Sequence, residues 1–281
     1  MSAGSTELSK AVATARDYYN SDDADRFYAI IWGGEDIHIG LYESGEDPIT
    51  EASHRTVEKL ADMLGPVSSQ TRVLDIGSGY GGGARYLADR FGCHVTALNL
   101  SEVENARARQ LNAERGLAER IDVIDGSFES IPAADASFDV VWSQDAILHS
   151  GQRERVLGEV ARVLKRGGVF VFTDPMQPDD CPEGVLDPIL ARIHLQSLGS
   201  PGFYREVGAR AGLTEEQFVP LTRQLVMHYS RVLQETERRA ADLEGKVAPD
   251  YIARMKKGLR HWVDGGERGH LVWGIFRFRK D

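Results

Sequence analysis

The chain has 281 residues, of which 42% are hydrophobic and 27% charged, and its formal net charge is −10. This length allows one large domain or one domain with a sizeable insertion, and the acidic balance argues against a nucleic-acid partner, because phosphates require a basic face. The first ten residues lack the apolar segment of a signal peptide, and no run approaches the ~18 apolar residues of a membrane span, so we expect a cytoplasmic protein that does not bind a membrane.

Helices are predicted before the first strand. One covers residues 8–20, and a short second helix begins at a cap formed by Asp22 or Asp23. Residues 32–34, which read WGG, end that helix. A third amphipathic helix covers residues 51–64 and is closed by a Gly-Pro pair.

From residue 72 onward, short apolar runs alternate with helical patterns, which predicts a parallel, doubly wound α/β sheet. The predicted strands of this part cover residues 72–76, 94–99, 121–124, 138–143 and 169–173. The predicted helices end at residue 91, cover residues 101–115 with Ser101 as the cap, and cover residues 153–164. We expect a turn at residues 165–168 and an end to the following strand at Asp174-Pro175.

The last third of the chain has a different pattern. A helix is predicted over residues 203–212, a strand over 216–221, a long helical insertion over 224–263, and a final strand over 270–279. Ligands of open α/β sheets bind beyond the carboxyl ends of the strands. We expect two segments, 176–200 and 224–265, to form a helical cap over that end.

The expected division of the chain follows from this pattern. Residues 1–70 form a helical lid segment, and residues 71–175 form the nucleotide-binding core. The remaining core helix and edge strands lie in residues 201–223 and 266–281.

A glycine-rich stretch, VLDIGSGYGGG at residues 73–83, follows the first predicted strand. Glycines allow a ligand to lie against bare main chain, and the next helix begins with free N–H groups. Gly77, Gly79 and Gly82 have the GxGxxG spacing, which by itself is also compatible with a dinucleotide enzyme. Asp75 before the first glycine resembles the first motif of class I S-adenosylmethionine-dependent methyltransferases.

Later strand ends supply further candidates. The second strand ends in Asn99, an amide where an acid normally binds ribose hydroxyls, and Leu100 would pack on adenine. The segment DGSFESIP resembles the adenine-binding segment of these enzymes, with Phe128 offering its backbone N–H and either Ser127 or Asp125 meeting the adenine amine.

The segment SFDVVWSQDAILH resembles the strand-four signature of methyltransferases. This resemblance implies that Gln144 lies by the methionine part of the cofactor. His149 follows Asp145 by four residues, about one helical turn, so both side chains could face one cleft. We predict Gln144 and His149 as catalytic residues.

The strings WGGEDIHIGLY, QDAILHS and WVDGGERGHLVWGIFRFRK resemble sarcosine/dimethylglycine N-methyltransferases, which make glycine betaine, and the likeness covers nearly the whole chain. The resemblance implies a Rossmann-like class I sheet of seven mostly parallel strands with an antiparallel last strand. It also implies that His38 and Gly40 lie near the cofactor carboxylate, and that Tyr19, Tyr28 and Trp32 border the methyl-transfer chamber.

The expected chemistry is transfer of a sulfonium methyl group to an unprotonated amine, with dimethylglycine and sarcosine as substrates. Aromatic faces suit the cationic groups, and no cluster of metal ligands is evident in the sequence. Arg223, His228 and Tyr229 are the further substrate-binding candidates, Arg223 for the substrate carboxylate. The proton of the amine could be removed by a base such as His149, or the site could select the neutral amine.

Three other functions are compatible with parts of the sequence. They are a methyltransferase acting on oxygen or carbon of another small molecule, a nucleotide-binding oxidoreductase, and a non-catalytic module that binds S-adenosylmethionine. Asn99 and the strand-four signature oppose the oxidoreductase. The aromatic lid and the large cap oppose a passive binding module, which needs no closed chamber.

Overall fold

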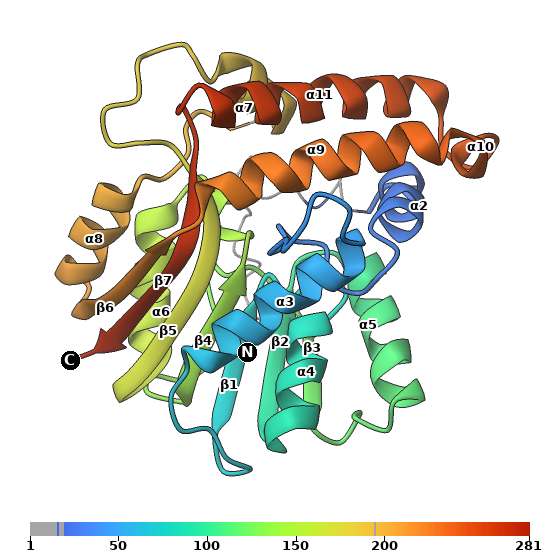
Figure 1. Ribbon diagram of the computed structural model, residues 1–281. Helices are drawn as coiled ribbons and strands as arrows, with labels where there is room; N and C mark the ends of the chain where they lie inside the picture. Colours follow the sequence, from blue (N-terminus) through green and yellow to red (C-terminus); the bar gives the residue numbers. More distant parts are fainter. Residues whose placement is uncertain (1–15, 17–19, 194) are drawn as a thin grey trace, which may run out of the picture.

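The computed structural model describes residues 16, 20–193 and 195–281, so most of the helix predicted over residues 8–20, Tyr19 included, lies outside the described ranges. A seven-stranded sheet with the order β3-β2-β1-β4-β5-β7-β6 forms the centre of the fold (Figure 1). The strands are β1 (Arg72–Ile76), β2 (His94–Asn99), β3 (Ile121–Asp125), β4 (Phe138–Gln144), β5 (Leu164–Met176), β6 (Leu213–Pro220) and β7 (Val272–Lys280).

The directions of the strands agree with the expected class I sheet. Strands β1 to β5 pair in parallel, whereas β7 lies between β5 and β6 and is antiparallel to both. The parallel strands consist largely of apolar residues because helices cover both faces of the sheet. The predicted fold class and the antiparallel last strand are therefore confirmed.

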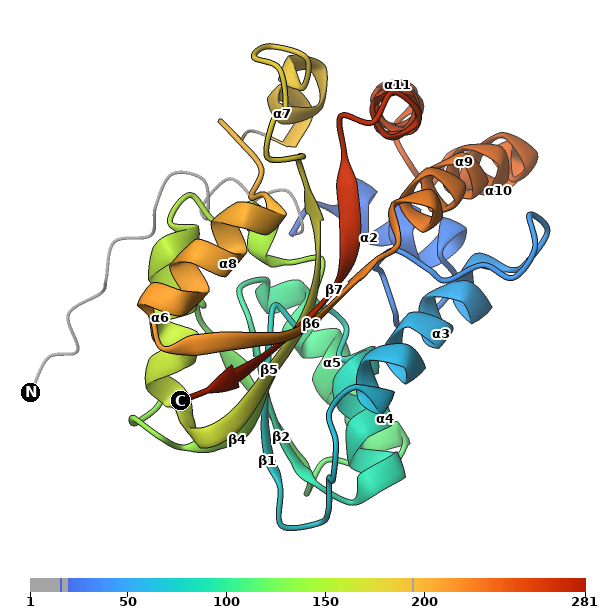
Figure 2. The same ribbon diagram turned by 60° about the vertical axis from the view of Figure 1, so that its left-hand side comes forward.

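Helices form a layer on each side of the sheet (Figure 2). Side chains of α6 (Arg153–Val163) and α8 (Pro201–Arg210) pack with β4, β5 and β7 in one apolar cluster. On the other face, α3 (Ile49–Asp62) and α4 (Gly82–Phe91) form a second cluster with β1 and β2, next to α5 (Glu102–Glu114). The two clusters hold the sheet in place, and the sheet carries the loops at its carboxyl end.

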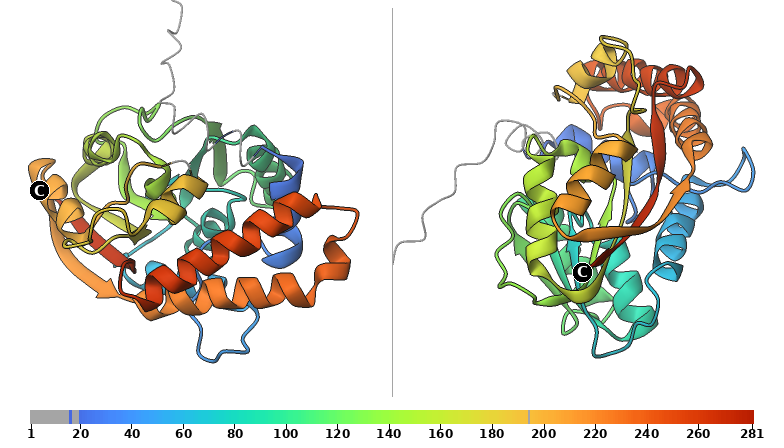
Figure 3. Two further views of the ribbon diagram at one scale, coloured as in Figure 1. Left: turned by 90° about the horizontal axis from the view of Figure 1, so that it is seen from above. Right: turned by 90° about the vertical axis from the view of Figure 1, so that its left-hand side faces the viewer.

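The remaining helices lie across the carboxyl end of the parallel strands (Figures 1 and 3). They are α2 (Asp22–Ile31), α7 (Asp187–Ile193), α9 (Thr222–Arg238), α10 (Ala240–Leu243) and α11 (Pro249–Glu267). Helices α9 and α11 lie side by side and are joined through α10, and α2 packs against them in an apolar cluster. None of the helices in the described ranges combines the length and the apolar character that crossing a bilayer requires.

Several local predictions were wrong, including the start of β6, which begins at Leu213 and not at residue 216. Ser21, rather than Asp22 or Asp23, caps α2, because its hydroxyl accepts from the Ala24 N–H. Helix α3 begins at Ile49, directly after Pro48, two residues earlier than predicted. Strand β5 is continuous over Leu164–Met176, where a turn and a stop at Asp174-Pro175 were expected.

The long β5 has a physical explanation. Its register with β4 shifts between Phe138 and Val140, and Gly167 has a φ of +75°, so the glycine pair forms an irregularity within the strand instead of a turn. Beyond Thr173, β5 pairs only with β7, and Pro175 is tolerated because a strand with one open side does not require every N–H.

Candidate active site

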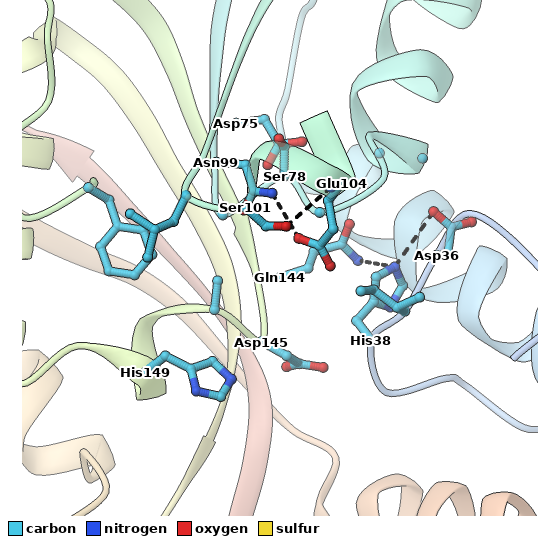
Figure 4. A pocket seen from close by; sticks show the side chains of 18 of the residues that line it. Asp36, His38, Asp75, Ser78, Asn99, Ser101, Glu104, Gln144, Asp145 and His149 are labelled. Atoms are coloured by element: carbon cyan, nitrogen blue, oxygen red, sulfur yellow. Dashed lines mark hydrogen bonds and ion pairs between the residues drawn. The ribbon is translucent and has the colours of Figure 1, made fainter. Parts of the chain in front are cut away.

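A cavity of about 920 Å³, measured with its open mouth, lies where β1, β2, β3 and β4 end (Figure 4). Ten of the residues predicted to bind cofactor or substrate line it: His38, Asp75, Gly77, Gly79, Asn99, Leu100, Ser127, Phe128, Gln144 and His149.

The glycine-rich turn forms one wall of the cavity. Gly77 has a φ of +75°, and a Cβ atom there would lie 2.4 Å from the Ala146 Cβ, so only glycine fits between β1 and the residues after β4. Gly79 also has a positive φ, of +51°. The turn leads into the amino terminus of α4, and the Ser78 hydroxyl is buried without a hydrogen-bond partner among the described residues.

Glu104 supplies the acid that the end of β2 lacks. Its carboxylate lines the cavity and accepts a hydrogen bond of 2.8 Å from the Asn99 side-chain amide. Ser101 caps α5 by accepting from the Glu104 N–H, which fixes Glu104 in the first turn of that helix. Burial raises the pKa of Glu104 to about 7, although the Asn99 hydrogen bond opposes this shift. Glu104 was not among the predicted site residues, although the sequence places it three residues after Ser101, the predicted helix cap.

The two alternatives at the end of β3 differ in their surroundings. Ser127 and Phe128 line the cavity. The Asp125 carboxylate instead accepts from the side chains of Asn105, at 2.7 Å, and Arg109, at 3.0 Å. Asp125 therefore braces α5 against β3, which leaves Ser127 as the residue of this pair that faces the cavity.

Asp145 follows β4 in an unusual conformation, with a φ of +50°. Its carboxylate oxygens accept from the Ile39 N–H at 2.7 Å and from the Trp273 indole N–H at 2.8 Å. Burial raises the pKa of Asp145, and the hydrogen bonds and the nearby His38 oppose that shift. Asp145 thus joins the segment before α3 to β7 and lines the cavity together with Gln144 and His149.

Six predicted residues lie in the described part but do not line this cavity, among them Gly40 and His228. Gly40 packs against α3, where a Cβ would lie 2.7 Å from Ala52. Its N–H donates to Nδ1 of His228, which also contacts the Tyr42 hydroxyl at 3.0 Å. The other four, Trp32 and Tyr28 from the first described helix and Tyr229 and Arg223 from α9, have no place in its lining either.

The surroundings of these residues differ. The ring of Trp32 lies 4.9 Å from that of Tyr28 and 5.4 Å from that of His228, and the ring of His228 lies 5.5 Å from that of Tyr229. These four rings form one aromatic group between α2 and α9. Burial lowers the pKa of His228 to about 3, and its imidazole is neutral. Arg223 is exposed.

Comparison with known proteins agrees with this geometry. Residues 74–172 match a family model described as a methyltransferase domain. A sarcosine/dimethylglycine N-methyltransferase of Halorhodospira halochloris is 58% identical over 96% of this chain and 97% of its own length. The enzyme of the same name from Aphanothece halophytica is 54% identical over 98% of this chain and 99% of its own.

Solved structures share the fold. A protein from Galdieria sulphuraria, described as a candidate sarcosine dimethylglycine methyltransferase, is 45% identical over 94% of this chain and 99% of its own, with a TM-score of 0.89. A geranyl diphosphate C-methyltransferase from Streptomyces coelicolor, solved with S-adenosyl-L-homocysteine, is 15% identical with a TM-score of 0.78 and covers 98% of this chain and all of its own. The latter likeness concerns the fold alone.

Proposed function

Because the chain belongs to the sarcosine/dimethylglycine N-methyltransferases, we propose that it methylates the amine nitrogen of sarcosine and of dimethylglycine to give glycine betaine. The observation that carries this proposal is 58% identity to such an enzyme over 96% of the chain. S-Adenosylmethionine is the cofactor. We further propose that the protein acts in the cytoplasm.

The cavity fits this cofactor. The positive φ angles of Gly77 and Gly79 favour glycine, which leaves the main chain bare at these two positions, and the buried Ser78 hydroxyl offers an unused hydrogen-bonding group. We propose that the carboxylate of Glu104, held by Asn99, accepts from the ribose hydroxyls, and that Leu100, Ser127 and Phe128 surround the adenine. When bound, S-adenosylmethionine supplies an electrophilic methyl group on a sulfonium.

The acidic side chains around the cavity suit the ammonium group of the substrate and the sulfonium group of the cofactor. Acidic side chains from four segments line the cavity: Asp36, Asp75, Glu104 and Asp145. Ammonium and sulfonium groups gain from such surroundings, whereas an anionic sugar phosphate would be repelled. We propose that the cap of α7 and α9–α11 keeps water from the reacting atoms, and that the aromatic group of Tyr28, Trp32, His228 and Tyr229 supports it.

The acceptor assay separates this function from its nearest alternative. Purified protein should transfer labelled methyl groups to dimethylglycine and sarcosine but not to phosphoethanolamine or a sugar. Transfer only to an oxygen or carbon acceptor would contradict the proposal, as would a thermal shift with NAD and none with S-adenosylmethionine.

His149→Ala should lower kcat/KM for dimethylglycine while the affinity for S-adenosylmethionine changes little. The reason is that His149 lines the same cavity as Gln144 from the short helix after β4, Ile147–His149, and we propose that it contacts the substrate. A lost hydrogen bond to a charged group corresponds to ~1.5–3 kcal/mol, or about ten- to a hundredfold in kcat/KM. Steady-state kinetics and calorimetry measure the two quantities, and an unchanged kcat/KM would remove His149 from the substrate site.

A further inference from the structure

Asp36 lies between two histidines, of which His38 faces the cavity and His54 faces the outer surface. Asp36 lines both the cavity of Figure 4 and a groove on the outer surface, whereas His38 lines the cavity but not the groove, and His54 lines the groove but not the cavity. Its Oδ1 lies 3.8 Å from Nε2 of His38, and its Oδ2 lies 3.3 Å from Nδ1 of His54. The His38 side chain is 8% exposed and that of His54 is 48% exposed.

The hydrogen bonds around His38 select one neutral form of its ring. The Trp142 indole N–H can only donate, so the atom that it contacts at 3.1 Å is the Gln144 oxygen. The Gln144 amide nitrogen then donates to Nε2 of His38 at 3.0 Å. Nε2 is therefore an acceptor, and Nδ1 carries the hydrogen and donates to the Ile39 carbonyl at 3.3 Å.

The Asp36 carboxylate is prepared for the charged form of the same ring. Its Oδ1 is buried and has no hydrogen-bond partner among the described residues. Gly82 makes room for this oxygen, since a Cβ atom there would lie 2.0 Å from it. A proton added to Nε2 of His38 would give Oδ1 a cationic partner 3.8 Å away, so the neutral ring is paired with Gln144 and the charged ring with Asp36.

The other charges near His38 come from several elements. Asp145 after β4 and Asp75 on β1 act on His38 together with Asp36, and His228 on α9 faces it from the cap. Arg85 on α4 lies near Asp36, with its charge paired to Glu35 at 2.7 Å. Burial lowers the pKa of His38, but the neighbouring carboxylates more than offset this and leave its pKa above the ordinary value.

We propose that His38 is a catalytic residue that accepts the proton of the substrate ammonium, with Asp36 as its counter-ion and His54 as the outer residue that positions Asp36. The inference rests on the proposed function. In this step the N–H bond of the ammonium breaks and its electron pair stays on the nitrogen. An N–H bond forms at Nε2 of His38, and the resulting imidazolium forms an ion pair with Oδ1 of Asp36. The nitrogen lone pair is then free to receive the methyl group.

Substitutions of Asp36 and of His54 should shift the titration midpoint of His38 in opposite directions, which tests the proposal. Asp36→Asn removes the counter-ion, so the titration midpoint of His38 falls. His54→Gln removes a positive charge that competes for the same carboxylate, so the midpoint of His38 rises. His94→Gln is the matched control, since His94 is 40% exposed and lies 3.8 Å from Asp122 at the opposite end of β2. Nitrogen-15 NMR of the histidine rings reads these midpoints in the protein without cofactor.

Single-turnover methyl transfer to saturating dimethylglycine provides the second measurement. Because the neutral ring accepts the proton, the rate should rise with pH through the His38 midpoint. That rise should move down in Asp36→Asn, up in His54→Gln, and not at all in His94→Gln. His38→Gln should lose about a hundredfold in rate, the lower end of the ~10²–10⁴-fold range for a positioned base. Thermal unfolding of each variant separates these effects from misfolding.

Two outcomes overturn the inference in distinguishable ways. An active wild-type protein whose His38→Gln variant keeps the full rate and the same pH profile overturns the role of His38 alone. Shifts of the same sign in Asp36→Asn and His54→Gln also overturn it. A wild-type protein that methylates neither amine at any pH overturns the proposed function, and the role of His38 with it.

Discussion

Replacing Gly77 by alanine should weaken the binding of S-adenosylmethionine about a hundredfold. A non-glycine residue at a φ of +75° costs ~1–2 kcal/mol, and the new Cβ would lie 2.4 Å from the Ala146 Cβ, so the turn and the residues after β4 must separate. The strain lowers stability, whereas the overpacking distorts the site itself, and a loss of about 3 kcal/mol of binding free energy corresponds to about two factors of ten in the dissociation constant. Isothermal titration calorimetry measures it directly.

Gly116 provides a matched control for Gly77. It has a φ of +69° between α5 and β3, and a Cβ atom there would meet nothing within 4 Å. Gly116→Ala should therefore lose ~1 kcal/mol of stability through backbone strain and keep the wild-type affinity for the cofactor. Equal affinities for Gly77→Ala and Gly116→Ala would show that the contact between the turn and Ala146 does not shape the cofactor site.

Glu104→Gln should stabilise the free protein at pH 8 and weaken cofactor binding at the same time. Below the ordinary pKa of 4.5, Glu104 is neutral in both the folded and unfolded chain. As the pH rises from there through about 7, the unfolded chain ionises while the fold resists ionisation, so the free energy of unfolding falls. At pH 8 this penalty is on the order of 3 kcal/mol, and glutamine removes it.

The effect of Glu104→Gln on binding has the opposite sign, because an amide accepts more weakly from hydroxyls than a carboxylate. The affinity for S-adenosylmethionine should fall about tenfold at pH 8. It should increase with pH through about 7 in the wild type and stay flat in the variant. Glu102→Gln, an exposed neighbour in the same helical turn, is the control and should change neither quantity appreciably. A destabilised Glu104→Gln variant with unchanged affinity would contradict the account.

The sequence by itself was sufficient to place the cavity residues that lie at the ends of the parallel strands. Asp75, Asn99 and Gln144 each lie at or near the end of a parallel strand, and the carboxyl ends of such strands share one edge of the sheet. Apolar runs and glycine spacing locate these ends without knowledge of any distant contact. The loop that begins at Gly77 was predictable for the same reason, since its backbone conformation is encoded in adjacent residues.

Only the tertiary structure decided which side chains of the helices and the lid segment face that edge. Glu104 reaches the cavity through the helix cap at Ser101, and Arg223 on α9 is exposed although the sequence made it the carboxylate candidate. The orientation of a helix about its own axis depends on the packing of its neighbours, which local patterns do not specify. His38 and Gln144 are 106 residues apart in the chain, and their contact, like that of Asp36 with His54, forms only when the segment before α3 packs on the sheet and on α3.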